Sequence, residues 1–144
     1  MGREIVDKES PNKPGKRSRL WRQEEVQNTL KYDEGTNAVQ GIVLDLLNIK
    51  DMQLSPQAFK KMYSLRSLKF YDFGISFYFY GTYNSKVHFP NGLSDLFGNL
   101  RSLIWLGCPL TALPSNFNPK NLVELNLRRS NLERLWDGIM VYIF

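Results

Sequence analysis

Residues 100–114, which read LRSLIWLGCPLTALP, decide the fold. Apolar or small side chains recur in this stretch at intervals of three and two residues, namely Leu100, Leu103, Trp105, Cys108, Leu110 and Leu113. Leu103 and Trp105 are separated by one residue, which is the spacing of one face of a β-strand. Pro109 and Pro114 exclude a continuous helix, because proline removes a backbone donor and clashes with the preceding turn. The stretch therefore predicts a short strand followed by a turn with its own buried side chains.

The same spacing occurs four times along the chain. Its first three apolar positions are Val39, Ile42 and Leu44; Leu65, Leu68 and Phe70; Leu100, Leu103 and Trp105; and Leu122, Leu125 and Leu127. The starts lie 26, 35 and 22 residues apart. Leucine-rich repeats have the pattern L-x-x-L-x-L-x-x-N/C-x-L and run about 20–29 residues. Cys108 takes the Asn/Cys position of the third unit, and Ser130 replaces it in the fourth. The spacing predicts four leucine-rich repeats with an insertion in the second.

One such repeat cannot bury its apolar face alone, so neighbouring repeats must stack. The expected fold is therefore α/β in character, a short leucine-rich-repeat solenoid. A bundle of amphipathic helices with many leucines is the alternative interpretation. The proline and glycine residues between the four matches argue against it.

Residues 1–37 have a different composition, with eight Lys/Arg and seven Asp/Glu. Five cations lie within Lys13–Arg22, and Pro11, Pro14 and Gly15 make the start of this basic segment a loop. Trp21, Val26 and Leu30 follow at helical spacing, with Glu24 and Glu25 near the expected helix start, where the dipole favours negative charge. Gly35 is the expected stop signal. The pattern predicts a helix, a basic loop and a second helix.

Several longer motifs resemble one protein class. They are MGREIV at 1–6, PGKRSRLW at 14–21, EGTNAVQGIVLDL at 34–46, SPQAFKKMYSLRSLKFY at 55–71, and the stretch at 87–138 that ends in NLERLWDG. Together they closely resemble the plant TIR–nucleotide-binding–leucine-rich-repeat disease-resistance proteins, which are intracellular immune receptors.

The resemblance implies a domain organisation. Residues 1–37 correspond to the C-terminal remnant of the winged-helix subdomain of the nucleotide-binding module, also called NB-ARC. Residues 38–138 correspond to about four leucine-rich repeats, and residues 139–144, IMVYIF, form an atypical tail. The expected fold class is thus a short solenoid preceded by a partial winged-helix remnant. A remnant without its normal core is expected to be loosely packed.

The resemblance also implies a function. A fragment of a plant innate immune receptor would use its repeats for protein recognition and for autoinhibitory contact in defence signalling. The implied partners are the receptor's own nucleotide-binding module, a pathogen effector or a guarded host protein, in the cytoplasm or the nucleus. No enzyme activity and no cofactor are expected, because the chain has no phosphate loop and no TIR domain. Full-length relatives bind ADP or ATP. A standalone binding module that acts as a decoy or regulator is an alternative, as is a non-functional truncated product.

The candidate contact residues are the strand positions that alternate with the buried ones, on the face expected to be concave. They are Val43, Asp45, Ser67, Lys69, Tyr71, Ser102, Ile104, Leu106, Glu124, Asn126 and Arg128. Solenoids commonly bind partners through such surfaces. We expect an intramolecular contact with the nucleotide-binding module in preference to direct recognition of a ligand.

Other candidate sites carry weaker signals. Lys13–Arg22 could bind nucleic acid, but residues 1–37 have a net charge of only +1, so a solvated loop is the preferred interpretation. The single cysteine and single histidine, Cys108 and His88, leave no multi-Cys or multi-His metal site. Both are expected to be structural. The longest apolar runs are too short to span a membrane.

Nine of the 19 aromatic residues fall between residues 70 and 89, at the inserted second repeat. An interaction patch is one interpretation of this cluster. Core and edge packing around the insertion is the preferred one.

Overall fold

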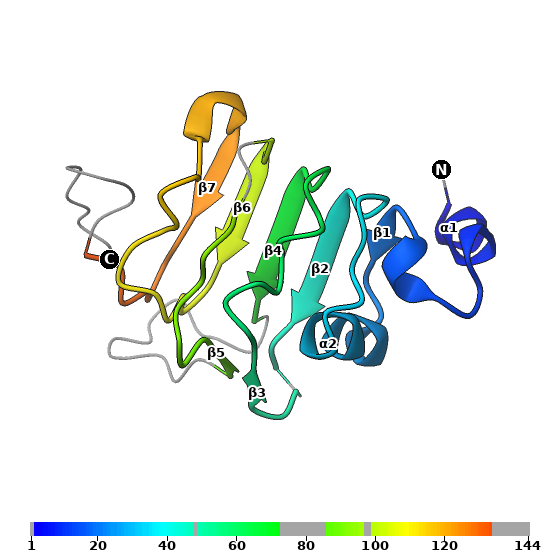
Figure 1. Ribbon diagram of the computed structural model, residues 1–144, viewed down its shortest axis with the longest axis horizontal. Coiled ribbons are helices and arrows are strands. Elements are labelled where there is room, and N and C mark those ends of the chain that lie inside the picture. The colour runs from blue at the N-terminus through cyan, green and yellow to red at the C-terminus, as the bar shows by residue number, and fades with distance from the viewer. Residues whose placement is uncertain (1, 48, 73–85, 97–98, 134–144) are drawn as a thin grey trace.

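The computed structural model describes residues 2–47, 49–72, 86–96 and 99–133 (Figure 1). Most of the aromatic segment and the tail 139–144 lie outside these residues. The helices are α1 (Arg3–Glu9) and α2 (Gln23–Lys31), with short 3-10 helices at Pro14–Lys16 and Pro119–Asn121. The strands are β1 (Arg19–Leu20), β2 (Gly41–Asp45), β3 (Met52–Gln53), β4 (Ser67–Tyr71), β5 (Val87–His88), β6 (Ser102–Trp105) and β7 (Glu124–Asn126).

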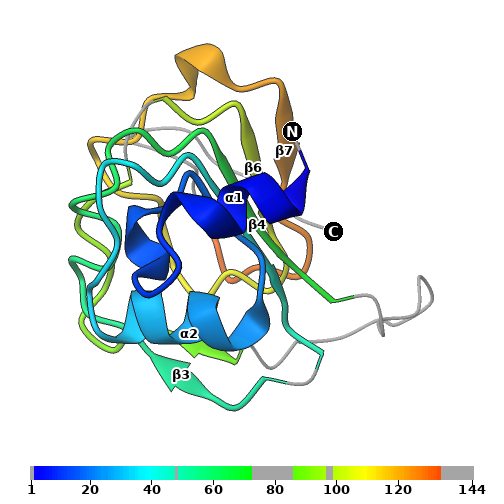
Figure 2. The same cartoon turned by 90° about the vertical axis from the view of Figure 1, so that its right-hand side faces the viewer.

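Five of these strands form one parallel sheet in the order β1-β2-β4-β6-β7, and β3 and β5 form a second, two-stranded parallel pair. Seen along the row of strands, the sheet forms one side of the molecule and the connecting segments form the other, with α2 near β3 (Figure 2). The described connecting residues lie behind the sheet (Figure 2), because parallel strands need crossover connections. The predicted α/β character is confirmed, and the sheet is parallel.

The strand register pairs the positions that the sequence pattern equates. Ile42 lies opposite Leu68, which lies opposite Leu103, which lies opposite Leu125. One residue before each strand, a backbone carbonyl accepts two N–H groups from the next unit. The carbonyls are those of Ser18, Gln40, Arg66 and Arg101, at donor–acceptor distances from 2.7 to 3.1 Å. Because Ser18 belongs to this column, the repeating hydrogen-bond pattern begins within residues 1–37 rather than at residue 38.

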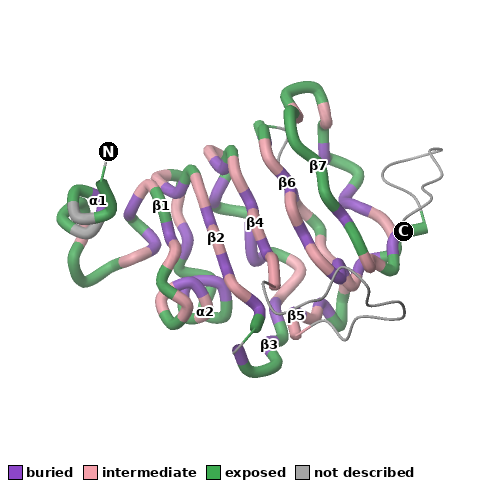
Figure 3. The backbone as a smooth tube through the Cα atoms, turned by 180° about the vertical axis from the view of Figure 1, so that it is seen from behind, coloured by how far each residue is buried: buried purple, intermediate pink, exposed green. Residues whose placement is uncertain are grey.

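The core lies behind the sheet and is built from the alternate strand positions. In β2, β4 and β6 every second side chain is buried, and the residues between them are half-buried (Figure 3). Four aromatic rings meet at its centre. Trp105 makes edge contacts with Phe70 at 5.0 Å, Phe89 at 5.8 Å and Phe59 at 6.4 Å between ring centroids. Phe70 and Phe89 belong to the aromatic cluster of the sequence, so these two members serve the core.

The first 37 residues follow the predicted order of helix, basic loop and helix. Helix α2 carries Glu24 and Glu25 in its first turn and Lys31 in its last, as the helix dipole favours. It ends before Gly35, because Asp33 adopts a left-handed conformation with φ 53° and the amide of Glu34 bonds back to Thr29. An aspartate therefore supplies the turn that was expected from the glycine.

The expected loose packing of this segment is wrong for the residues around α2. Val26 and Leu30 are fully buried and belong to the same core cluster as the strand leucines. The 3-10 turn Pro14–Lys16 is also tied down, because the carbonyl of Gly15 accepts bonds from the backbone and side chain of Thr36 at 3.0 and 2.6 Å. The apolar side of α2 packs near β2 and β3, which supplies the core that the segment was expected to lack.

Replacing Trp105 with phenylalanine should cost less than about 1.5 kcal/mol of unfolding free energy. The substitution removes volume, which destabilises a core. It also removes the indole N–H, which is buried without a hydrogen-bond partner among the described residues, and an unpaired buried donor is costly. Urea unfolding of Trp105→Phe, compared with that of Phe59→Leu, measures the balance between the lost volume and the removal of the unpaired N–H group. A loss above about 3 kcal/mol for Trp105→Phe would contradict the idea that the indole N–H is unpaired.

Candidate functional site on the open face of the sheet

The face of the five-stranded sheet opposite the core is termed the open face. It carries the strand residues that alternate with the buried ones: Arg19, Gly41, Val43, Asp45, Ser67, Lys69, Tyr71, Ser102, Ile104, Glu124 and Asn126. Leu106 and Arg128 continue the same alternation one step beyond β6 and β7. These side chains are half-buried on β2, β4 and β6 and exposed on β7. All the contact residues predicted from the sequence therefore lie on the open face or at the ends of its strands.

Strand register places these residues in rows across the sheet. Ser67, Ser102 and Glu124 form one row, and Val43, Lys69, Ile104 and Asn126 form the next. Asp45 lies opposite Tyr71. Between the first two rows, Lys69 Nζ lies 3.6 Å from Glu124 Oε1 across two strand spacings. The two groups are more than one third exposed, so this ion pair orders the surface more than it stabilises the fold.

Two of the predicted contact residues also have a local structural role. The Asp45 carboxylate accepts a hydrogen bond from the backbone of Leu47 at 3.0 Å, and the Asn126 amide oxygen accepts one from Arg128 at 3.2 Å. Short polar side chains commonly stabilise turns in this way. They fix the chain where it leaves the strand, so substitutions at these two positions would change backbone geometry as well as surface chemistry.

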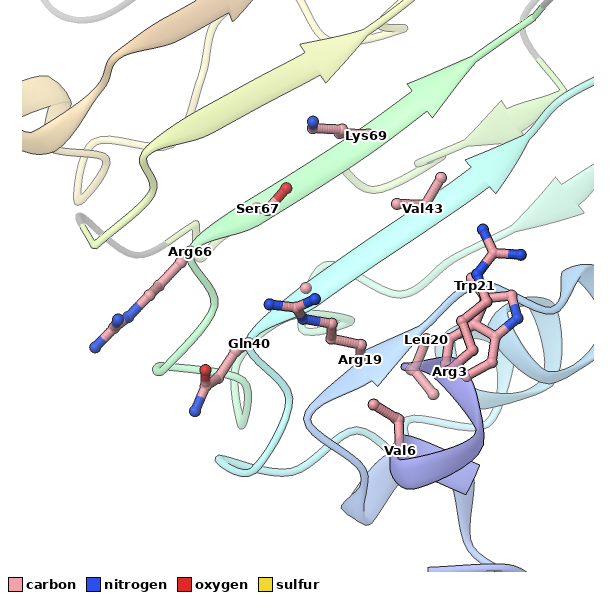
Figure 4. A pocket seen from close by; sticks show the side chains of 11 residues that line it. Arg3, Val6, Arg19, Leu20, Trp21, Gln40, Val43, Arg66, Ser67 and Lys69 are labelled. Carbon is pink, nitrogen blue, oxygen red and sulfur yellow. The ribbon is translucent and has the colours of Figure 1, made fainter. Parts of the chain in front are cut away.

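At the N-terminal end of the open face lies a half-open pocket of about 400 Å³ (Figure 4). Its lining residues come from α1, β1, β2, β4 and the positions next to them: Arg3, Val6, Arg19, Leu20, Trp21, Gln40, Gly41, Val43, Arg66, Ser67 and Lys69. The sequence patterns included Arg19 and Trp21 as members of the basic segment Lys13–Arg22, and they did not identify Arg3, Gln40 or Arg66 as candidate contact residues. The sequence signal for β1 was weak, because the strand has only Arg19 and Leu20, and two residues are too few to separate a strand from a loop.

The basic segment Lys13–Arg22 is not uniformly solvated. Arg17 is 4% exposed, and its guanidinium donates to both carboxylate oxygens of Glu25, at 2.8 and 3.0 Å, and to the carbonyls of Ser10 and Pro11. At least this cation serves the fold. The exposed cations of the segment include Arg19, which faces the pocket.

Cys108 and His88 lie in different environments, the first buried and the second partly exposed. Burial raises the pKa of the Cys108 thiol to about 12, so the thiolate needed for nucleophilic attack does not form near neutral pH. His88 lies on β5, where its Nε2 is 3.8 Å from Asp51 Oδ1. In the described part of the chain, no three His, Cys, Asp or Glu side chains are grouped as metal ligands. Among the same residues, no helix is long and apolar enough to cross a bilayer.

Comparisons with known proteins agree with this architecture. The family described as "Leucine Rich Repeat" matches residues 121–140. Disease resistance protein RPP2A of Arabidopsis thaliana is 44% identical over 138 residues, and disease resistance protein TAO1 of the same plant is 40% identical over 144 residues. Each alignment covers 96% of this chain. The chain is a relative of plant disease resistance proteins. The resemblance to the TIR–nucleotide-binding–leucine-rich-repeat class is confirmed.

The aligned region is only a small part of each of these resistance proteins. The chain spans about a tenth of the length of the curated relatives, 10% of RPP2A and 11% of TAO1. Disease resistance-like protein DSC1, also from Arabidopsis, is 42% identical over 119 residues, or 83% of the chain. No solved structure gives a significant match. The family match and these relatives together show a leucine-rich-repeat region in the chain.

Proposed function

We propose that this chain is the leucine-rich-repeat part of a plant immune receptor and that its open face makes a protein contact in defence signalling. One observation carries the proposal. The predicted contact residues gather on one face of the sheet, and on β2, β4 and β6 the residues between them are buried in the core, whereas Leu125 on β7 is 42% exposed. Such a face can change its chemistry without loss of the fold, as a recognition surface requires.

An intramolecular contact with the receptor's own nucleotide-binding module is the first role we propose for this face. In support, residues 1–37, which resemble the end of that module, supply β1 to the sheet and Arg3 and Arg19 to the edge of the open face. The module would thus meet the repeats beside these residues. A pathogen effector or a guarded host protein is the second class of partner, and the cytoplasm or the nucleus the proposed compartment.

The repeats at 38–138 are proposed to stack as a short solenoid, with residues 1–37 as the remnant of a winged-helix subdomain that precedes it and 139–144 as an atypical tail. From Ser18 to Arg101, one backbone carbonyl before each strand of the five-stranded sheet accepts the same two hydrogen bonds from the next unit, which supports regular stacking. ADP or ATP would bind to the nucleotide-binding module of the receptor and not to this chain.

A chimeric receptor tests the inhibitory contact. The segment of RPP2A that aligns with this chain would be replaced by the chain itself, and cell death would be scored in leaves without a pathogen. We expect Ile104→Asp, in the middle of the open face, to raise cell death above that of the unsubstituted chimera. A charge placed in a protein contact should weaken the inhibited state.

Val123→Asp is the matched control, because Val123 is 87% exposed and precedes β7. This variant should behave like the unsubstituted chimera. Equal behaviour of Ile104→Asp and Val123→Asp, with equal protein levels, would contradict an intramolecular contact at the open face.

A further inference from the structure

We propose that the pocket at the N-terminal end of the open face, called the Gly41 pocket, receives an acidic side chain from a protein segment that crosses the strands there. The inference rests on the proposed function, in which the open face contacts protein, and it names the chemistry of that partner. The Gly41 pocket is formed by the residues that line it, from α1 across β1 and β2 to β4 (Figure 4).

The charge of the lining is one-sided. Four of the eleven lining residues are cationic, namely Arg3, Arg19, Arg66 and Lys69, and none of those described is acidic. They come from three separate parts of the fold, α1, β1 and the start of β4. Gln40 and Ser67 add neutral hydrogen-bond donors. A carboxylate is an acceptor for such donors, and a single arginine can bind it through two parallel hydrogen bonds.

The hollow of the Gly41 pocket exists because Gly41 has no side chain. The equivalent positions in the following strands carry Ser67, Ser102 and Glu124, whereas Gly41 places no side chain on the open face. An ideal Cβ at Gly41 would touch only Arg19 Cγ, at 3.7 Å, and Ser67 Cβ, at 4.0 Å, which are ordinary contact distances. The space above β2 is therefore open, and a larger side chain could fill it without strain in the backbone.

The Trp21 ring supports one wall of the Gly41 pocket. The Trp21 ring has the Arg3 guanidinium 5.4 Å and the Arg22 guanidinium 5.0 Å from its centroid. Cation–π contacts of this kind hold an arginine in position. The contact with the ring leaves the N–H groups of Arg3 able to donate hydrogen bonds to an incoming anion.

The spread of the cations favours a peptide over a small anion. Figure 4 shows Arg19 lying over β2, Arg3 against Trp21, and Arg66 extending away from the sheet, so the charges do not converge on one point. An extended segment presents acidic side chains at intervals along its length, which suits such an arrangement. Lys69 already pairs with Glu124, which shows that a carboxylate has access to this side of the pocket.

Binding of a short peptide in which Glu alternates with Gly tests the inference, with the Gln–Gly peptide as the reference. Fluorescence anisotropy on the full chain at low salt would give both affinities. We expect the Glu peptide to bind and the Gln peptide not to bind. Arg19→Gln should weaken binding by about tenfold, since one charged hydrogen-bonding partner is lost.

Gly41→Thr is the sharper variant, because it keeps every charge and fills the hollow. It should weaken binding of the Glu peptide as much as Arg19→Gln does. Lys50→Gln, an exposed cation on the loop before β3, is the matched control and should leave affinity within about twofold, as expected for screened distant charges. Circular dichroism of each variant would verify that the fold is retained.

Three results would overturn the inference. They are absence of Glu-peptide binding, an effect of Lys50→Gln equal to that of Arg19→Gln, or full binding by Gly41→Thr. Tripolyphosphate that binds tightly and is excluded by Gly41→Thr, while the Glu peptide is not bound, would instead assign the pocket to a phosphorylated ligand. Failure here is separate from failure of the proposed function, because Ile104→Asp lies outside the Gly41 pocket and reports on the open face alone.

Discussion

Gly15→Ala is expected to lower the free energy of unfolding by at least about 3 kcal/mol, which is a large part of the stability of a domain of this size. An ideal Cβ at Gly15 would lie 2.0 Å from the carbonyl oxygen of Glu34 and 2.7 Å from its carbon. Both are backbone atoms, so no side-chain rotation can relieve the overlap. The turn at Pro14–Lys16 would have to separate from the chain after α2, and the bonds from Thr36 to the Gly15 carbonyl would be strained or lost.

Urea unfolding, followed by circular dichroism, measures this change. Gly41→Ala is the matched control, because its Cβ would make only ordinary contacts at 3.7 Å or more. It should leave stability unchanged or raise it by about 0.5 kcal/mol, as alanine reduces the freedom of the unfolded chain. If the two variants unfold at the same urea concentration, the close approach of residue 15 to residue 34 is wrong.

Arg17→Met should cost about 3 kcal/mol, because it removes one partner of a buried charged network. All three guanidinium nitrogens of Arg17 are used. Nε bonds to the Ser10 carbonyl at 2.9 Å, one terminal nitrogen binds both Glu25 oxygens, and the other bonds to the Pro11 carbonyl at 2.9 Å. The substitution keeps much of the side-chain volume but leaves the Glu25 carboxylate and two carbonyls without this donor. Ser10 and Pro11 would then lose the hydrogen bonds that link them through Arg17 to Glu25 of α2.

Arg17→Lys tests whether the positive charge alone is sufficient for the stability that Arg17 provides. Lysine cannot reproduce the planar fork, so we expect a loss of about 2 kcal/mol. Arg22→Met is the control, since Arg22 is 3.6 Å from the same Glu25 carboxylate but half exposed, and its loss should be below about 1 kcal/mol. Equal losses for Arg17→Met and Arg22→Met in thermal or urea unfolding would contradict a structural role for Arg17.

Spacing alone was sufficient to predict the strands β2, β4, β6 and β7. The leucines and aromatics at positions such as Leu68 and Leu103 alternate with surface residues, and the structure pairs them directly. Strand alternation also placed the contact residues, because a side chain next to a buried one in a strand must point to the other face. These two rules act locally, so they can be applied to a sequence without knowledge of distant contacts.

The first strand and the pocket were not predictable in this way. β1 has only two residues, and its pairing with Gly41 and Ile42 depends on contacts across about twenty residues of chain that include α2. The sequence also did not show that the basic segment contains both a buried and an exposed arginine. Arg17 is buried and Arg19 is exposed, although they are two residues apart with similar neighbours. What separates them is the position of Glu25, which is fixed only when α2 is formed and packed.

Hydrogen exchange of the native chain tests most directly whether the first segment and the repeats form one cooperative unit. The decisive amides are those of Gln40 and Gly41, which bond to the Ser18 carbonyl at 2.7 and 3.1 Å, and of Ser67 and Ser102, which make the equivalent bonds further along the sheet. We predict that Gly41, Ser67 and Ser102 exchange with similar protection, and that Leu30 in α2 is protected with them, because one core supports all four. Rapid exchange of Leu30 and Gly41, with Ser67 and Ser102 still protected, would show instead that residues 1–37 are not part of the repeat structure.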